Sequence, residues 1–253
     1  MTKFLAYGCP HAPLTHRGWL EWLIRQIEEF RPQVIVNLGD QYESKWAKRW
    51  PKWSDEDWSV LDEHNATADQ LDAINKAAPR ATKVWLAGNH DCNGFNVHPD
   101  RIAADIVPAL HWRENRRVSK ALEKWTVKDE YRHRPTSVYR LGQVAFAHGF
   151  ETSKAGLRRS VRRYAPYYGL FIQAHTHRPD FFQLESDGQL EGFWYANPGT
   201  GADWDKMHYM DRADVTKWGR GCIVGECNAN RSAFASKQWD AELRVHSLAD
   251  ERF

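Results

Sequence analysis

The chain has 253 residues, of which 27% are charged and 42% hydrophobic, and its formal net charge is +2. This length and composition predict one globular domain over residues 1–253, and a charge so near zero excludes a uniformly basic nucleic-acid-binding protein. No apolar stretch is long enough to span a membrane, and the first residues lack the pattern of a secretory signal, so we expect a cytoplasmic protein with no membrane partner.

The four cysteines, Cys9, Cys92, Cys222 and Cys227, do not suggest a disulfide framework in a chain of this length. A zinc knuckle at Cys222 and Cys227 is the weaker alternative, because no second cysteine or histidine pair lies nearby. Buried free thiols are the favoured interpretation.

Taken in chain order, apolar runs typical of β-strands stop repeatedly at a cluster of His, Asp or Asn. The runs, with the polar residues that end them, cover residues 4–11, 34–41, 83–91, 144–149 and 170–177. Helical periodicity separates the first three: one helix is predicted within residues 14–30, with Thr15 as its N-cap, and another from Ser54 as N-cap to about Asn75. This alternation predicts βαβ units and a largely parallel sheet.

The carboxyl ends of parallel strands meet at one edge of a sheet, where ligands bind in such folds. One site there would collect the candidate ligands Cys9, His11, Asp40, Asn89, His148, His175 and His177. Each element alone has a simpler explanation, because a histidine at a strand end is often structural and Gly-Asp after a strand is often a turn. Five such ends in one chain indicate a metal site instead.

The last part of the chain is less regular. Residues 203–220 are predicted to form a long loop that lines the mouth of the site. Residues 221–228 and 241–246 are predicted as strands of a second sheet, together with 137–141 and 181–195.

The order of these motifs resembles that of the calcineurin-like metallophosphoesterase superfamily. The matching segments are Cys9-Pro10-His11, Gly39-Asp40, Gly88-Asn89-His90-Asp91, His148-Gly149, Ala174-His175-Thr176-His177 and Asn197-Pro198-Gly199-Thr200. The resemblance implies an α/β fold, a two-sheet α/β/β/α sandwich, that hydrolyses phosphate monoesters or diesters at a dinuclear metal site with a bridging hydroxide. The family pattern has Asp where this chain has Cys9, and Gly where it has Ala174.

The resemblance also implies a role for each residue of the site. Cys9, His11 and His177 would hold the first metal ion and Asn89, His148 and His175 the second, with Asp40 bridging both. His90 would donate a proton to the leaving oxygen, and Asp91 would orient its ring. The expected cofactors are two transition-metal ions, Mn, Zn or Fe.

Cys9 is the main departure from the family pattern. A thiolate keeps the negative charge of the missing carboxylate but is a softer ligand, which favours Zn or Fe over Mg or Ca. Two alternatives stay open: Cys9 lies near a metal ion without binding it, or the pocket is vestigial on a scaffold protein. Cysteine-dependent phosphatase chemistry is excluded, because it needs an arginine six positions after the cysteine and that position holds Thr15.

Two segments are candidates for binding the substrate, a phosphate ester with nucleotides and nucleic acids among the options. Residues 41–58, within an insert over 41–65, interleave basic residues with four tryptophans that would either stack bases or form a cap on the domain. Residues 154–163 would place Arg158 and Arg162 on one helix face, toward a phosphate-rich partner or toward solvent. Arg178, directly after His177, is a third candidate.

Three functions fit the sequence: a phosphatase or phosphodiesterase, a DNA exonuclease-like nuclease of the same superfamily, and a non-catalytic binding module with a degenerate metal site. A phosphoprotein substrate is disfavoured, because Gly-Asp-Gln-Tyr-Glu-Ser stands where protein phosphatases of the superfamily have Gly-Asp-x-Val-Asp-Arg-Gly. The natural substrate, the metal identity and the oligomeric state stay open.

Overall fold

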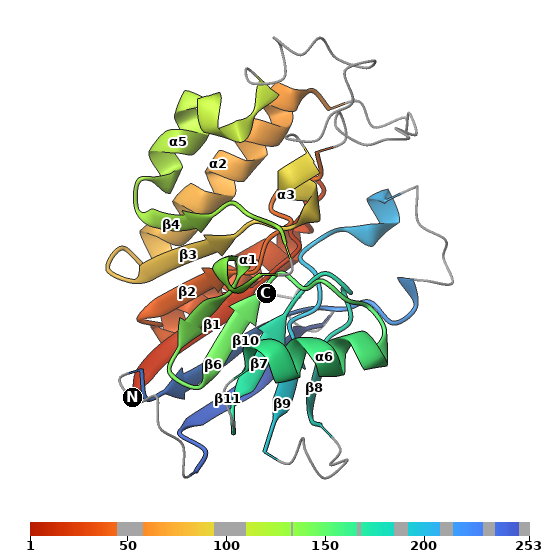
Figure 1. Cartoon of the computed structure of the whole chain (residues 1–253). Coiled ribbons are helices and arrows are strands. Elements are labelled where there is room, and N and C mark those ends of the chain that lie inside the picture. The colour runs from red at the N-terminus through yellow and green to blue at the C-terminus, as the bar shows by residue number, and fades with distance from the viewer. Residues whose placement is uncertain are drawn as a thin grey trace.

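The fold is described from a computed structural model of the chain (Figure 1). The structure describes residues 1–44, 58–93, 110–132, 134–165, 168–184, 192–207, 215–229 and 236–247. The described helices are α1 (Arg17–Phe30), α2 (Val60–Ala77), α3 (Asn89–Asn93), α5 (Arg116–Leu122) and α6 (Lys154–Tyr164), with 3-10 turns at Trp112–Glu114, Pro135–Ser137 and Trp204–Lys206. The described strands are β1 (Thr2–Tyr7), β2 (Val34–Asn37), β3 (Thr82–Leu86), β4 (Trp125–Lys128), β5 (Tyr139–Leu141), β6 (Val144–Ala147), β7 (Leu170–Gln173), β8 (Asp180–Gln183), β9 (Trp194–Asn197), β10 (Arg220–Cys227) and β11 (Trp239–His246).

The first sheet has six strands in the order β11-β10-β1-β2-β3-β4. Strands β1 to β4 are parallel, whereas β10 runs antiparallel to β1 and β11 antiparallel to β10. The predicted βαβ units are therefore confirmed, because helices α1 and α2 connect β1 to β2 and β2 to β3. Such crossovers keep consecutive strands parallel and bring their carboxyl ends to one edge.

The second sheet has five strands in the order β5-β6-β7-β9-β8, and β6, β7 and β9 in its centre are parallel. The prediction that residues 221–228 and 241–246 belong to this sheet is wrong. They form β10 and β11 of the first sheet, where β10 pairs with β1 from Thr2 opposite Cys227 to Ala6 opposite Ile223. The apolar side chains of β10 are buried on both faces, which a central strand of the first sheet requires.

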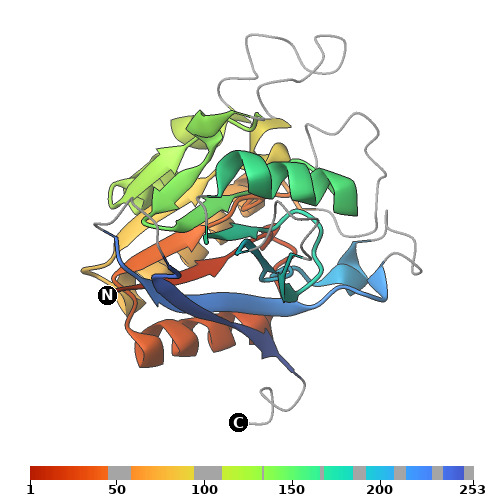
Figure 2. The same ribbon diagram turned by 60° about the horizontal axis from the view of Figure 1, so that its bottom comes forward.

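The two sheets and the helices form four layers, so the predicted α/β/β/α sandwich is confirmed. Strand β1 shows the packing: Phe4 and Ala6 point between the sheets, and Leu5 and Tyr7 point toward α1 and α2. Another apolar cluster packs α6 on the outer face of the second sheet through Val161. Figure 2 shows α1 and α6 on opposite sides of the strands.

Both long helices of the first half begin later than the sequence predicts. His16, and not Thr15, caps α1, because its ring accepts the Trp19 amide while the Thr15 hydroxyl donates to the Pro10 carbonyl. A reciprocal capping box with Ser59 as the cap starts α2, whereas the predicted cap Ser54 lies outside the described residues. In the part of the chain that the structure describes, no helix combines the length and apolar character that crossing a membrane demands.

Candidate metal centre

The loops that follow β1, β2, β3, β6 and β7 carry the candidate ligands, and the fold brings these loops to one place. Three sets of potential ligand atoms lie within 4.8 Å of one another in the described residues: Cys9, His11 and His177; Cys9, Asp40 and His148; and His11, Asp40 and His90. Cys9, His11 and Asp40 belong to two sets each. The side chains therefore form one continuous cluster of sulfur, nitrogen and oxygen donors.

The backbone of this cluster is unusual, because five of its residues have a positive φ. The values are 52° for Cys9, 50° for His11, 51° for Asp40, 67° for His175 and 60° for His177. A left-handed conformation costs about 1 kcal/mol or more for a residue with a side chain, and it persists where the surroundings enforce it. Strain concentrated in one cluster is typical of a functional site.

Backbone hydrogen bonds between neighbouring loops hold this conformation. The Cys9 amide donates to the Gly39 carbonyl at 2.8 Å, and the His11 amide donates to the Asp40 carbonyl at 3.0 Å. Gly39, with φ 99°, allows the close approach of the next loops, because a Cβ there would collide with the Leu86 carbonyl oxygen and the Gly88 nitrogen.

Glu43 orients His11 in the first half of the site. Its Oε2 lies 2.8 Å from Nδ1 of His11, and both side chains are buried. Nδ1 then donates to the carboxylate, and Nε2 keeps a lone pair 3.2 Å from Nε2 of His177 and 3.9 Å from Oδ2 of Asp40. Two imidazole nitrogens that face each other at this distance suit a shared cation, and the buried Nδ1 of His177 has no hydrogen-bond partner in the described structure.

His148 is oriented in the same way in the second half of the site. Its Nδ1 donates to the Leu38 carbonyl at 2.8 Å, which turns Nε2 toward Oδ2 of Asp40 at 3.2 Å and Oδ1 of Asn89 at 3.1 Å. The ring centroids of His148 and His175 are 5.1 Å apart. Metal-bound histidines are commonly held by a hydrogen bond from their other nitrogen, so this geometry fits a second ion.

The protonation states also suit metal binding. Burial lowers the pKa of three of the histidines. The pKa of His11 is lowered, that of His175 falls to about 4, and that of His177 is well below its usual range. These rings are therefore neutral at neutral pH. Burial opposes the charged forms of His148 and Asp40, but each favours the charged form of the other. The pKa of His148 is therefore raised, and that of Asp40 is well below its usual value. A bound cation would take the place of the proton on His148.

Cys9 lies at the junction of the two halves. Its Sγ accepts a hydrogen bond from the His175 amide at 3.3 Å and belongs to the sets formed with His11 and with Asp40. Burial raises the pKa of the thiol well above its usual value, and the Asp40 carboxylate raises it further. Binding of a metal ion by Cys9 would therefore release a proton.

Taken together, the donor set fits transition-metal ions. Neutral imidazoles, one thiol, one carboxylate and one amide oxygen are the ligands that Zn, Fe and Mn accept, whereas Mg and Ca prefer sites built from oxygen alone. The structure brings together all seven predicted ligands, either through these ligand sets or through the contacts of Asn89 and His175 with His148.

The predicted role of Asp91 is wrong. Its carboxylate accepts hydrogen bonds from the Tyr42 amide at 2.9 Å, the Gly88 amide at 2.8 Å and Nε1 of Trp85 at 3.3 Å. These contacts fix the turn between β3 and α3, and they do not orient the ring of His90. That ring is held by Glu43, whose carbonyl oxygen lies 2.8 Å from Nδ1.

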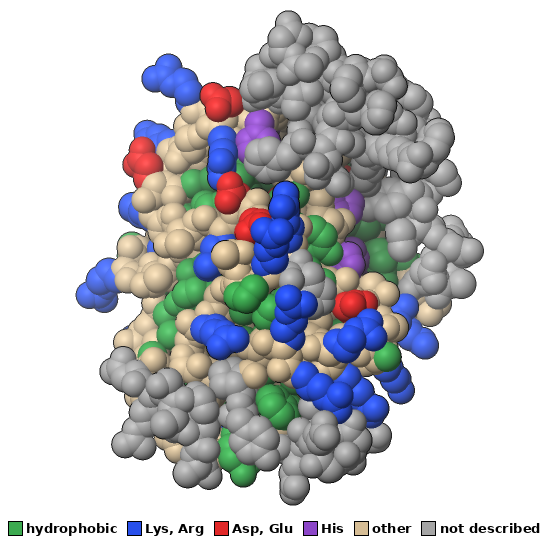
Figure 3. Space-filling model, in the orientation of Figure 1, with side chains coloured by type: hydrophobic (Ala, Val, Ile, Leu, Met, Phe, Trp, Pro, Cys, Tyr) green, Lys and Arg blue, Asp and Glu red, His purple; other side chains and the backbone are tan. Residues whose placement is uncertain are grey.

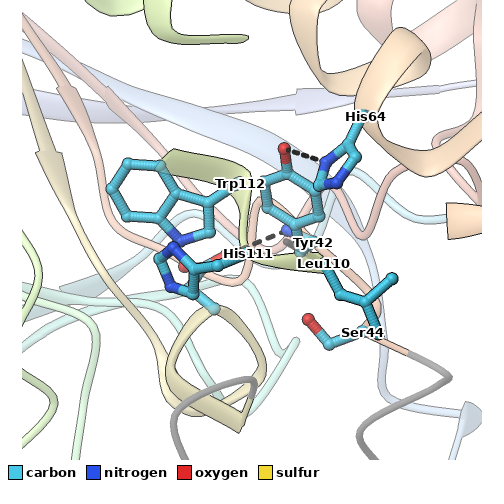
Figure 4. A pocket seen from close by; sticks show the side chains of 7 residues that line it. Tyr42, Ser44, His64, Leu110, His111 and Trp112 are labelled. Carbon is cyan, nitrogen blue, oxygen red and sulfur yellow. Dashed lines mark hydrogen bonds between the residues drawn. The ribbon is translucent and has the colours of Figure 1, made fainter. Parts of the chain in front are cut away.

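A small pocket lies next to the loop that carries Asp40 and Glu43 (Figure 4). Its lining residues are Tyr42, Ser44, His64, Asp91, Leu110, His111 and Trp112. The hydroxyl of Tyr42 lies 3.1 Å from Nδ1 of His64, and the Ser44 amide donates to the Glu63 carboxylate. Both contacts tie the loop to α2, so they fix the position of Glu43.

The Asn197–Thr200 segment anchors two of the ligand loops. Nδ2 of Asn197 donates to the Ala174 carbonyl at 3.0 Å, and the Thr200 hydroxyl donates to the Cys9 carbonyl at 2.7 Å. The element holds the backbone on both sides of the site and offers no metal-ligating side chain in these contacts.

The site is flanked by aromatic side chains that the sequence analysis did not identify. The ring of Tyr131 lies 5.5 Å from that of His148 and 6.4 Å from that of His175. The ring of Trp218 lies 4.2 Å from that of His177 on the other side. Both rings are half-buried, so each keeps surface exposed at the edge of the site.

The three candidate substrate arginines lie outside the cluster of ligands. Arg158 and Arg162 are on α6, and Arg178 is exposed directly after His177. Most of the Trp-rich segment, residues 45–57, lies outside the described residues, as do residues 208–214 of the loop predicted to line the mouth.

A sequence model of one protein family, described as calcineurin-like phosphoesterase, matches residues 2–193. The match covers more than half of the chain and includes all seven predicted ligands. No curated protein sequence matches the chain.

Several solved structures are similar to the chain at low sequence identity. A single mutant of Vps29 from Entamoeba histolytica is 12% identical, with a TM-score of 0.45 over 97% of this chain and 99% of that one. YfcE, a phosphoesterase from E. coli, is 13% identical, with a TM-score of 0.44 over 92% and 97%. Vacuolar protein sorting 29 from Cryptosporidium parvum is 12% identical, with a TM-score of 0.44 over 97% and 98%.

Proposed function

Because the chain belongs to the calcineurin-like phosphoesterase family, we propose that it hydrolyses phosphate esters at a centre of two transition-metal ions. Family membership and the cluster of potential metal ligands support metal-dependent hydrolysis of phosphoesters in general. The number of ions and the residues assigned to each are the finer part of the proposal.

The observation that carries the proposal is the position of Asp40. One oxygen of its carboxylate, Oδ2, lies 3.9 Å from Nε2 of His11 and 3.2 Å from Nε2 of His148. Each of these rings has its other nitrogen engaged, by Glu43 and by the Leu38 carbonyl. A carboxylate between two histidines oriented in this way suits a bridge between two cations.

Two groups of residues would hold the ions. Cys9, His11 and His177 would form the first group and Asn89, His148 and His175 the second, with Asp40 shared. Ions of this kind polarise phosphoryl oxygens and lower the pKa of bound water, which supplies a nucleophile at neutral pH.

The chain itself would supply the proton for the leaving group. The Glu43 carbonyl holds Nδ1 of His90 as a donor, so that Nε2 is the nitrogen left to exchange a proton with substrate. Asp40 also accepts the His90 amide at 2.8 Å, which keeps the ring next to the centre. We therefore assign His90 as the general acid and Glu43 as the residue that positions it.

Metal analysis combined with an activity assay tests the proposal. The full-length protein, loaded with Mn, Zn or Fe, should bind two equivalents and hydrolyse nitrophenyl phosphate monoesters or diesters in a chelator-sensitive manner. Asp40→Asn should lose most of this activity, whereas Asp240→Asn, on the exposed edge strand β11, should keep it. Less than one equivalent of metal and no activity with any of the three metals would favour a non-catalytic binding module.

A further inference from the structure

Helix α6 carries a concentration of positive charge that the proposed chemistry does not explain. The described residues between Gly149 and Leu184 contain six lysines and arginines, Lys154, Arg158, Arg159, Arg162, Arg163 and Arg178, against two carboxylates, Glu151 and Asp180. Figure 3 shows Lys and Arg side chains gathered over the place that α6 occupies in Figure 1. The chain as a whole has a net charge of only +2, so this face is a local patch.

The positive charges of α6 follow one stripe of the helix. Lys154, Arg158 and Arg162 are spaced by four residues and line a single open groove together with Ala155 and Arg159. Successive residues of the stripe are separated by about 6 Å along the helix axis. Other residues of α6, among them Ser160 and Val161, are buried, and Val161 packs against the second sheet. Arg159 beside the stripe is paired with the Glu151 carboxylate at 3.1 Å. An anion that lies along the groove would meet Lys154, Arg158 and Arg162 in succession.

The stripe begins beside the metal centre. The N-cap of α6, Ser153, follows His148 by five residues, and the Glu151 carbonyl accepts a hydrogen bond from Gln173, two residues before His175. Arg178, which is exposed, lies in the chain between His177 and β8 and adds a further positive charge next to a ligand residue.

Aromatic rings flank the metal centre itself, with Tyr131 beside His148 and Trp218 beside His177. Tyr131 stacks on Phe150, whose ring lies 5.9 Å from that of Tyr164 in α6, and Trp218 contacts His177 on the other side. A positive groove on one helix and half-exposed aromatic rings at the centre are the two features that bind single strands of nucleic acid, because phosphates need cations and unpaired bases stack on rings.

We infer that the Lys154–Arg158–Arg162 stripe binds the phosphate backbone of a single-stranded nucleic acid and leads one of its phosphodiesters to the metal centre. The inference rests on the proposed function and names the substrate class of that same site. A duplex is disfavoured because its paired bases are not free to stack on Tyr131 or Trp218.

Binding of a labelled single-stranded oligonucleotide, followed by fluorescence anisotropy at several salt concentrations, tests this inference. The full-length protein is kept metal-free with EDTA, so that binding is measured without hydrolysis. The test variant is Arg158→Gln/Arg162→Gln, and the charge-matched control is Arg17→Gln/Arg25→Gln on α1, at the opposite side of the sandwich. Circular dichroism checks that both variants are folded.

The stripe variant should bind about tenfold more weakly than the control, and the slope of log affinity against log salt should fall by about 1.4 in magnitude, which corresponds to two lost phosphate contacts. The control should bind like the unmodified chain. Three results would overturn the inference. They are an equal loss of affinity in both variants, no binding of the oligonucleotide by the unmodified chain, and tighter binding of a duplex or of anionic lipid vesicles than of the single strand. Because hydrolysis of small nitrophenyl esters is measured separately, such a result would leave the proposed hydrolase function standing.

Discussion

Glu43 accepts a hydrogen bond from His11: Oε2 of the buried carboxylate lies 2.8 Å from Nδ1 of the ring. The same residue holds His90 through its backbone carbonyl, at 2.8 Å from Nδ1. One residue that binds no metal in the proposed centre thus orients a proposed ligand through its side chain and the proposed general acid through its backbone.

Replacement of this carboxylate should weaken metal binding at the first position. Glu43→Gln keeps the shape of the side chain but removes the charge that fixes the His11 tautomer, so we expect a loss of affinity of about 10- to 100-fold for one of two ions. Competition with a metal-sensitive dye measures the change, and Glu21→Gln, on the exposed face of α1, is the control. Unchanged affinity for both ions would show that Glu43 does not support the site.

Cys9 should decide which metals occupy the first position. With cobalt as a probe, the unmodified chain should show the intense near-ultraviolet absorption of a thiolate–cobalt bond, and Cys9→Asp should lose it while still binding two ions. Cys9→Asp should also shift preference from Zn toward Mg or Mn, because a carboxylate is a harder ligand. If the thiolate absorption is missing in the unmodified chain, Cys9 lies near the metal without binding it.

The role of His90 should appear as a dependence on the leaving group. His90→Ala should retain its metal content and lose turnover mainly on esters with poor leaving groups, by about 10²- to 10⁴-fold, because good leaving groups need no proton. Metal analysis and kinetics on a series of aryl phosphate esters check this. Equal losses across the series would contradict the role as general acid. A loss of metal would instead assign His90 as a ligand, as its proximity to His11 and Asp40 allows.

His111 should make the fold sensitive to acid. Burial, assisted by the charge of Arg113, lowers the pKa of His111 from 6.5 to about 4, and its Nδ1 accepts the Arg113 amide at 3.2 Å. The unfolded chain therefore takes up a proton at this residue before the folded one does. Stability that is present above pH 6.5 should be lost as the pH falls toward 4.

His111→Asn tests this dependence, because asparagine can cap the same 3-10 turn and does not titrate. Thermal unfolding between neutral pH and pH 4 should show a shallower decline for the variant than for the unmodified chain. Parallel curves would show that other groups cause the acid sensitivity.

The sequence predicted the strand ends of this fold well, because short apolar runs that stop at His, Asp or Asn are local signals. It assigned β10 and β11 to the wrong sheet, because the partner of a strand is set by contacts more than 200 residues away, as between Thr2 and Cys227. Thr15 was predicted as a helix cap from residue propensity. In the structure its hydroxyl donates to the Pro10 carbonyl, and His16 caps α1 instead.

At the site, local motifs identified the ligands but not the residues that support them. Glu43 stands in a polar stretch with no periodicity, and only the folded loop brings it to His11. Asp91 was assigned to its sequence neighbour His90, although its carboxylate accepts from Gly88 and Trp85 just before it and from Tyr42 in the distant loop after β2. A sequence motif names residues that are adjacent in the chain, whereas hydrogen bonds select partners in space.

Anomalous X-ray scattering from crystals of the full-length protein grown with zinc tests the central claim most directly. Two peaks should lie on either side of the Asp40 carboxylate, one bounded by Cys9, His11 and His177 and the other by Asn89, His148 and His175. A single peak, or scattering only at positions outside this cluster of side chains, would contradict the dinuclear centre.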